Sequence, residues 1–204
     1  MSRYLQRYTE EERRNHWIVA IAFVLAALSG LAVFHPSMFW LSTFFGGGPW
    51  TRILHPYIGL AMFAFFLVTM VRFWRDNRLT ADDKKWLSQW RDAVAKREDR
   101  LPQSGRYNGA QKMVFWVSVI CMLTLFATGL LFWRAQFGDL FPVWLIRLGS
   151  LLHAFAATIL IITIIVHVYA AIWVKGSIRA MVRGDVSEAW AKKHHAAWYR
   201  EMTR

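Results

Sequence analysis

Four long apolar blocks dominate the pattern of hydrophobic and polar positions along the chain. They occupy residues 17–34, 53–71, 113–133 and 148–174, and none of them contains Asp, Glu, Lys or Arg. A helix needs about 20 such residues to cross a bilayer, so the pattern predicts four transmembrane helices, the last long enough to tilt or project. Acidic residues (10–12) precede the first block and no small-residue cleavage site follows it, so we expect a retained span rather than a signal peptide.

The basic residues gather on one side of the predicted bundle. Three connections hold 22 of the 25 Lys and Arg residues, and the two connections on the other side hold 3. The first set is residues 1–16, 72–112 and 175–204, and the second is residues 35–52 and 134–147. Cytoplasmic loops carry this excess in membrane proteins. We therefore expect an all-α integral membrane protein, a four-transmembrane-helix bundle with both termini in the cytoplasm. The loop (residues 72–112) and the tail (residues 175–204) would lie in the cytoplasm as well.

Length, charge and cysteine content limit the kinds of domain, partner and cofactor site that the chain can have. The 204 residues have the length of one domain, and we expect a single membrane domain over residues 1–204. The net charge of +12 does not indicate a nucleic-acid partner, because the basic residues lie between apolar blocks, where lipid headgroups are the expected partner. The lone cysteine, Cys121, excludes an internal disulfide, a C-x-x-C-H haem-attachment motif and a cysteine-ligated iron–sulfur cluster.

Two connecting segments have an amphipathic helical pattern. In the loop, Asp83 stands three residues after Thr80, which is the spacing of a capping box. Apolar residues then follow at intervals of four, and the tail has a similar interval. The residues on these faces are Trp86, Trp90 and Val94 in the loop and Trp190, His194 and Trp198 in the tail. Each segment fits either the membrane surface, with tryptophans at the headgroups, or a docking face for a soluble partner.

Four of the seven histidines lie within or at the edge of predicted spans, where ionisable groups are costly and mark functional sites. His153 and His167 are fourteen residues apart on one span, so they share a face and stand roughly 21 Å apart. His55 matches the depth of His153 at the outer side, and His16 matches His167 at the inner side. Haem iron accepts axial imidazoles, so the pairs predict two non-covalent, bis-histidine b-type haems.

Small residues offer weaker support for these sites. The residue four positions after each histidine shares its helix face and would admit a macrocycle, although small residues are also common at membrane helix contacts. These residues are Ala20, Gly59, Ala157 and Ala171. His35, just before Pro36, is an alternative to His55, whereas His194 and His195 lie in a basic tail and are expected to be solvated.

Other functions fit the spans less well. The absence of carboxylates from the four apolar blocks argues against a metal-ion site and against a proton-relay transporter, which usually needs Asp or Glu in its spans. The remaining alternative from the residues alone is a haem-free membrane anchor whose histidines make packing hydrogen bonds.

Six segments resemble one family essentially from end to end. That family is the cytochrome b (gamma) subunit of respiratory membrane-bound formate dehydrogenases. The tail segment and HVYAAIWVKG are more specific to this family than any motif that haem-b membrane proteins share in general. The segments are RYTEEERRNHW (7–17), RILHPYIG (52–59), GRYNGAQK (105–112), HAFAA (153–157), IVHVYAAIWVKGSI (165–178) and WAKKHHAAWYRE (190–201).

The resemblance implies a bacterial inner-membrane subunit with two haem b groups, the outer held by His55 and His153 and the inner by His16 and His167. Electrons would come from a periplasmic iron–sulfur (beta) subunit and reduce menaquinone near the cytoplasmic side, which generates a membrane potential. A molybdenum- or tungsten-containing catalytic (alpha) subunit would oxidise formate, so this chain would hold no catalytic residue. A hydrogenase or thiosulfate reductase is the alternative complex.

The resemblance also implies a quinone pocket beside the inner haem. It uses an N-x-G-Q-K segment together with His167, and the segment is Asn108, Gly109, Ala110, Gln111 and Lys112 here. The sequence departs from the pattern at Ala110, where the family has glycine. The arginines that flank the spans fit either haem propionates or ordinary membrane anchors, and they are Arg13 and Arg14 inside and Arg52 outside.

Overall fold

The computed structural model describes residues 3–95, 97, 100–137 and 140–203. Among them, four helices are long and apolar enough to span a membrane, which confirms the all-α, multi-pass class. They are α1 (Glu10–Phe34), α2 (Gly48–Phe73), α5 (Gly109–Leu131) and α7 (Val143–Trp173). Each begins four to seven residues before its predicted block, because polar residues that end an apolar block need not end a helix.

Short elements connect these helices. The 3₁₀ helix η1 leads from α1 to α2, and the antiparallel strand pair β1–β2 places Leu5 opposite Val186. The bounds are β1 (Tyr4–Gln6), η1 (Pro36–Phe45), α3 (Ala81–Ser88), α4 (Trp90–Val94), α6 (Arg134–Phe137), α8 (Ser177–Arg183), β2 (Asp185–Ser187), α9 (Glu188–His194) and α10 (Ala196–Met202).

The chain divides into two compact units, which are described separately. The bundle unit comprises Arg14–Val71 and Ser118–Thr163, and the terminal unit comprises Met1–Arg13, Arg72–Val117 and Ile164–Arg204.

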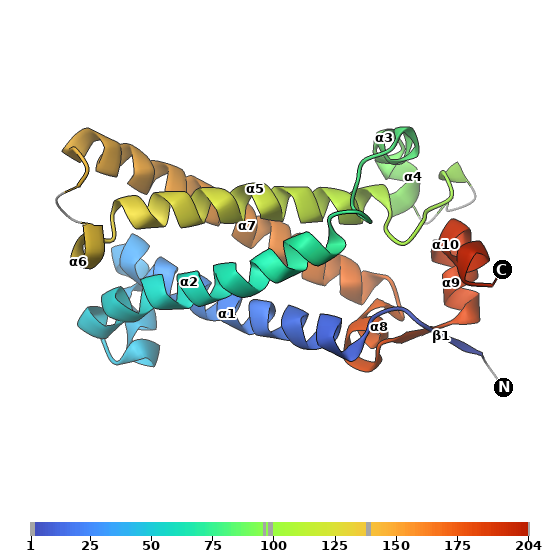
Figure 1. Cartoon of the computed structure of the whole chain (residues 1–204), viewed down its shortest axis with the longest axis horizontal. Helices are drawn as coiled ribbons and strands as arrows, with labels where there is room; N and C mark the ends of the chain where they lie inside the picture. Colours follow the sequence, from blue (N-terminus) through green and yellow to red (C-terminus); the bar gives the residue numbers. More distant parts are fainter. Residues whose placement is uncertain (1–2, 96, 98–99, 138–139, 204) are drawn as a thin grey trace. The chain divides into compact units, whose positions relative to one another are not determined.

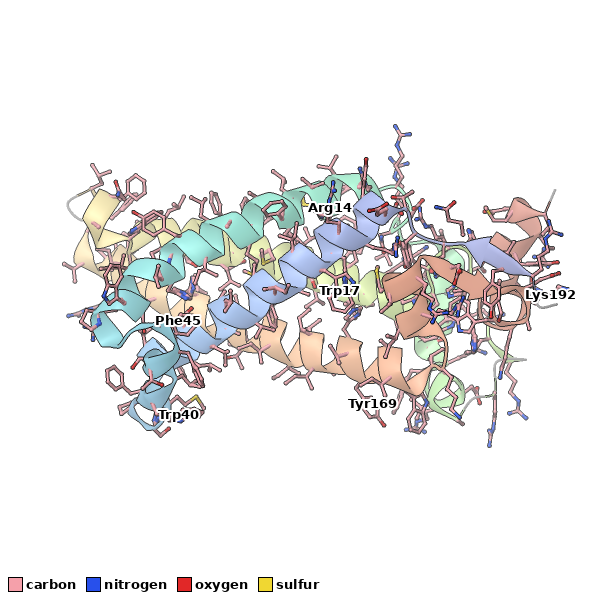
Figure 2. The ribbon with its side chains drawn as sticks, turned by 90° about the horizontal axis from the view of Figure 1, so that it is seen from below. Arg14, Trp17, Trp40, Phe45, Tyr169 and Lys192 are labelled. Atoms are coloured by element: carbon pink, nitrogen blue, oxygen red, sulfur yellow. The ribbon has the colours of Figure 1, made fainter. Side chains whose placement is uncertain are left out.

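In the bundle unit, segments of all four long helices lie side by side (Figure 1). The rings of Phe63 and Phe126 stack at 4.1 Å between α2 and α5. Large apolar side chains such as Ile21 and Leu151 are exposed, and Trp40 projects outward from η1 (Figure 2). A soluble protein would not expose this much apolar surface, whereas lipid tails solvate it well.

The terminal unit has a small core of its own, formed by Tyr8, Phe73, Ala180, Val186, Ala191 and Trp198. The capping box expected at Thr80 and Asp83 is present at the start of α3. The continuous amphipathic helix expected after it is wrong, because the chain breaks at Gln89, and Trp90 lies in the separate helix α4. A short helix owes its continuity to tertiary packing more than to its own pattern.

The expectations for the tail need two corrections. His195 is buried at 1% exposure rather than solvated, and Trp198 belongs to the core rather than to a membrane-facing surface. His195 also separates α9 from α10, so the helical face expected from Trp190 to Trp198 is interrupted. The cause is tertiary, because Nδ1 of His195 bonds the Gly105 carbonyl at 2.8 Å, a contact 90 residues away in the sequence.

Candidate functional site

His55 on α2 and His153 on α7 meet inside the bundle unit. Their ring centroids lie 6.3 Å apart with 71° between the ring planes. A metal-bound imidazole nitrogen lies about 2 Å from the metal and the ring centre about 1 Å farther, so two axial ligands on one iron place their ring centres about 6 Å apart. The two histidines thus have the separation that a bis-histidine haem needs.

A buried hydroxyl holds each of these rings. Ser29 Oγ on α1 lies 2.9 Å from Nδ1 of His55, and Thr128 Oγ1 on α5 lies 3.0 Å from Nδ1 of His153. Each hydroxyl also donates to the carbonyl four positions earlier in its helix, at 2.8 and 2.6 Å. With its one hydrogen on the carbonyl, the hydroxyl accepts from an imidazole that is protonated on Nδ1. That tautomer leaves Nε2 its lone pair, which is the nitrogen that would bind iron.

Glycines next to these hydroxyls give the rings space. A Cβ on Gly30 would come within 3.1 Å of Cε1 of His55, and a Cβ on Gly129 within 3.5 Å of Cε1 of His153. The small residues expected to admit the haem lie on the histidines' own helices, whereas these glycines lie on α1 and α5. The signal in the sequence was a hydroxyl residue followed by glycine, which occurs once on α1 and once on α5.

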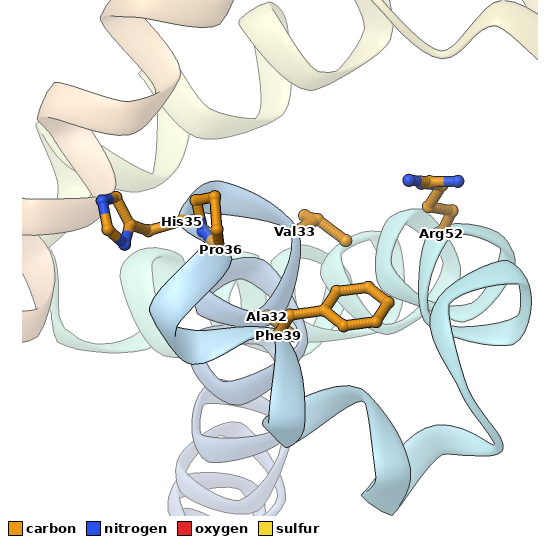
Figure 3. Close-up of a pocket in the computed structure, with 6 residues that line it drawn as sticks. All are labelled: Ala32, Val33, His35, Pro36, Phe39 and Arg52. Carbon is orange, nitrogen blue, oxygen red and sulfur yellow. The ribbon is translucent and has the colours of Figure 1, made fainter.

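His35 has a local role instead. Its Nδ1 accepts a hydrogen bond from the backbone N–H of Ser37 at 3.2 Å and caps η1. It lines a surface cavity of about 340 Å³ with Ala32, Val33, Pro36, Phe39 and Arg52 (Figure 3). Arg52 stands three positions before His55, so it lies on the same side of α2, one turn nearer the beginning of the helix.

The inner pair is distributed over the two units. His16 lies on α1 in the bundle unit, and His167 lies on α7 in the terminal unit, so their pairing stays a prediction. Asn15, next to His16, donates from Nδ2 to the Phe65 carbonyl at 3.1 Å and to Thr69 Oγ1 at 2.7 Å. These bonds join the beginning of α1 to α2 within the bundle unit.

Asn108 and Gln111 cap the beginning of α5 reciprocally. The backbone N–H of Gln111 donates to Oδ1 of Asn108 at 2.9 Å, and the backbone N–H of Asn108 donates to Oε1 of Gln111 at 3.0 Å. Since both side-chain oxygens are used as acceptors, the NH₂ groups are the ends of these side chains that can donate to a ligand. The Ala110 side chain between them is exposed, so its methyl group has room.

The comparisons with known proteins identify the family. A family model described as prokaryotic cytochrome b561 matches residues 7–184. The chain belongs to this family.

Individual relatives narrow the assignment. The chain is 47% identical to the cytochrome b556(fdo) subunit of formate dehydrogenase from Escherichia coli K12, over 97% of this chain and 93% of the relative. It is 42% identical to the nitrate-inducible cytochrome b556(Fdn) subunit of the same organism, over 95% and 89%. The Haemophilus influenzae cytochrome b556 subunit is 37% identical over 96% and 82%. These matches confirm the resemblance to formate dehydrogenase cytochrome b subunits.

Membership in a cytochrome b family implies bound haem b, and the bundle unit of this cytochrome b fits it. His55 and His153 offer two imidazoles at axial separation, each with Nδ1 at a hydroxyl. A Cβ on Gly59, one turn after His55, would meet nothing within 4 Å, as expected beside a haem plate. The residues present therefore suit one bis-histidine haem in this unit.

Lys112, the last residue of the segment expected from the resemblance to bind quinone, has a structural partner. Its Nζ donates to Asp83 Oδ2 at 2.7 Å and to the Arg78 carbonyl at 2.9 Å, and both ion-pair members are buried. Burial opposes ionisation of Asp83, but hydrogen bonds from Lys112 and Thr80 hold the pKa of the carboxyl below its ordinary value. A Cβ on Gly109 would lie 3.0 Å from the Asp83 backbone oxygen, so any larger residue would press on the Asp83 backbone.

Proposed function

We propose that this chain is the membrane subunit of a formate dehydrogenase and holds two b haems, the outer by His55 and His153 and the inner by His16 and His167. The imidazoles of His55 on α2 and His153 on α7, whose ring centroids lie 6.3 Å apart, carry the proposal. Bound haem b supplies one-electron redox chemistry, and two haems separated by roughly 21 Å along α7 would relay electrons across the membrane.

The direction of transfer follows from the proposed partners. Electrons enter from a periplasmic iron–sulfur (beta) subunit and reduce menaquinone near the cytoplasmic side. A molybdenum- or tungsten-containing catalytic (alpha) subunit oxidises formate, so this chain has no catalytic formate site. Relatives that are formate dehydrogenase subunits support these partners. Because electrons move inward and the quinone takes protons from the inner side, the reaction builds a membrane potential.

The residues have separate roles in this proposal. Arg52, one turn from His55, would offset the charge of the propionates of the outer haem. Asn108 and Gln111 donate from their NH₂ groups to the quinone carbonyls, beside His167 of the inner site. Two electrons and two protons convert the quinone to the quinol, and the protons come from the cytoplasm.

Haem quantitation tests the proposal. The purified protein should give a b-type reduced-minus-oxidised spectrum and two haems per chain by pyridine haemochrome assay. Replacing His167 with Ala should remove the inner haem and leave one, whereas His35→Ala should leave both because His35 caps η1. A colourless protein, or two haems retained in His167→Ala, would refute the assignment.

A further inference from the structure

The two outer-site histidines are held by the same construction, built from different helices. On α1, the Ser29 hydroxyl lies at Nδ1 of His55, and Gly30 leaves open the space beside Cε1 of that ring. On α5, the Thr128 hydroxyl lies at Nδ1 of His153, and Gly129 follows it in the same way. Both hydroxyl residues are buried, Ser29 at 0% and Thr128 at 6% exposure.

The Ser29 and Thr128 hydroxyls make one contact more than a hydroxyl in a membrane helix needs. A Ser or Thr in a membrane helix needs only the carbonyl four positions earlier, and Thr158 on α7 makes such a bond, to Ala154 at 2.9 Å. Ser29 and Thr128 make this bond and also accept from an imidazole on another helix. While the hydroxyl hydrogen is on the carbonyl, the hydroxyl accepts from the imidazole, which matches the tautomer with a proton on Nδ1.

The hydroxyls restrain the rings, and Gly30 gives the His55 ring room. Rotation of either ring about its Cβ–Cγ bond would carry Nδ1 away from the hydroxyl. A Cβ at Gly30 would lie 3.1 Å from Cε1 of His55, so the ring would have to shift by a few tenths of an ångström. The hydroxyl contacts therefore hold the ring planes, which stand 71° apart.

We propose that Ser29 and Thr128 are positioning residues that set the tautomer, ring plane and donor strength of the outer haem ligands. This inference rests on the proposed haem role of His55 and His153. When a hydroxyl accepts a hydrogen bond from the Nδ1–H of a ligand histidine, the imidazole becomes a stronger ligand at Nε2. A stronger imidazole ligand favours ferric over ferrous iron. Loss of either hydroxyl should therefore raise the reduction potential of the outer haem. Nearly perpendicular imidazole planes also give a ferric haem a strongly anisotropic electron paramagnetic resonance signal, which a loosened ring would shift.

Thr128→Val tests the inference in the full complex, because valine keeps the shape of threonine and removes the hydroxyl. One of the two haems should show a raised midpoint potential and a shifted largest g value, while the other keeps both. Thr128→Ser restores the hydroxyl and should restore potential and signal. Thr158→Val, which removes a hydroxyl bonded within its own helix, should change neither.

Ser29→Ala provides a second variant with the same expected direction. If Thr128→Val loses the outer haem altogether, the loss supports the inference only when Thr128→Ser retains that haem with wild-type potential. Two haems with unchanged potentials and signals in both Thr128→Val and Ser29→Ala would overturn it. A wild-type protein without haem would instead refute the proposed function.

Discussion

Arg7 and His195 are buried side by side in the terminal unit, a cation beside a neutral imidazole. Arg7 donates from Nη2 to the Arg106 carbonyl at 2.6 Å, and the same nitrogen lies 3.2 Å from Nε2 of His195. Nδ1 of His195 donates to the Gly105 carbonyl, so Nε2 is the acceptor of the Arg7 bond. The guanidinium also lies 5.0 Å from the rings of Trp190 and Trp198, whose faces attract a cation.

This arrangement makes the stability of the terminal unit depend on pH. Burial, followed by the charge of Arg7, lowers the pKa of His195 to about 3. The unfolded chain takes up a proton below its ordinary pKa of about 6.5 and the folded chain does not. The contribution of neutral His195 to the free energy of unfolding is therefore complete above about pH 6.5. It decreases as the pH falls towards 3, by roughly 1.4 kcal/mol per pH unit.

Thermal unfolding of the detergent-solubilised protein checks this prediction between pH 7.5 and pH 5. The apparent Tm of the wild type should fall relative to that of His195→Gln, which keeps a donor and an acceptor but does not titrate. Lys193→Ala, at an exposed neighbouring position, should retain the wild-type slope. Equal slopes in the wild type and His195→Gln would contradict the role of His195.

At the scale of elements, two side chains at the beginning of α5 have two roles each, helix capping and the proposed quinone contact. Asn108 and Gln111 use their oxygens to cap the helix, and the proposed quinone contact uses their NH₂ groups. A carboxylate accepts the capping bonds as well as an amide does, and it suits the positive end of a helix. It has no hydrogen to offer a quinone carbonyl.

Gln111→Glu therefore separates capping from quinone binding. The thermal stability should stay within about 0.5 kcal/mol of the wild type, because the cap survives. Electron transfer from formate to a menaquinone analogue in the complex should fall about tenfold, the effect of losing one hydrogen bond of roughly 1.4 kcal/mol. Haem reduction by formate is the control and should be unchanged. An unaltered quinone reductase rate would assign Gln111 to capping alone.

At the scale of the whole molecule, the charge along the sequence predicts how the chain sits in a membrane. The ends and the middle connection hold 22 of the 25 Lys and Arg residues, which the inner surface of a bacterial membrane favours. Alkaline phosphatase is active only outside the cytoplasm. It should be active when fused after Gly47, between α1 and α2, and inactive when fused after Ala95, between α4 and α5. The reverse pattern would invert the membrane orientation and with it the proposed direction of electron flow.

The family assignment and the four spans could be predicted from the sequence. Span length and apolar composition are local properties of consecutive residues, and they do not depend on which helices become neighbours. Short motifs such as HVYAAIWVKG carry the family resemblance in the same local way. The proximity of His55 to His153 was also predictable, because depth in a membrane follows from position along a helix.

Contacts between distant parts of the chain were decided only by the tertiary structure. Ser29 and Thr128 look like ordinary back-bonded hydroxyls until α1 and α5 pack beside the two histidine rings. His195 lies in a basic segment that suggests solvent, yet its contact with Gly105 buries it and ends α9. The physical reason is that hydropathy fixes which segments leave water, whereas the partner of each buried polar group depends on helix rotation and packing, which no local pattern specifies.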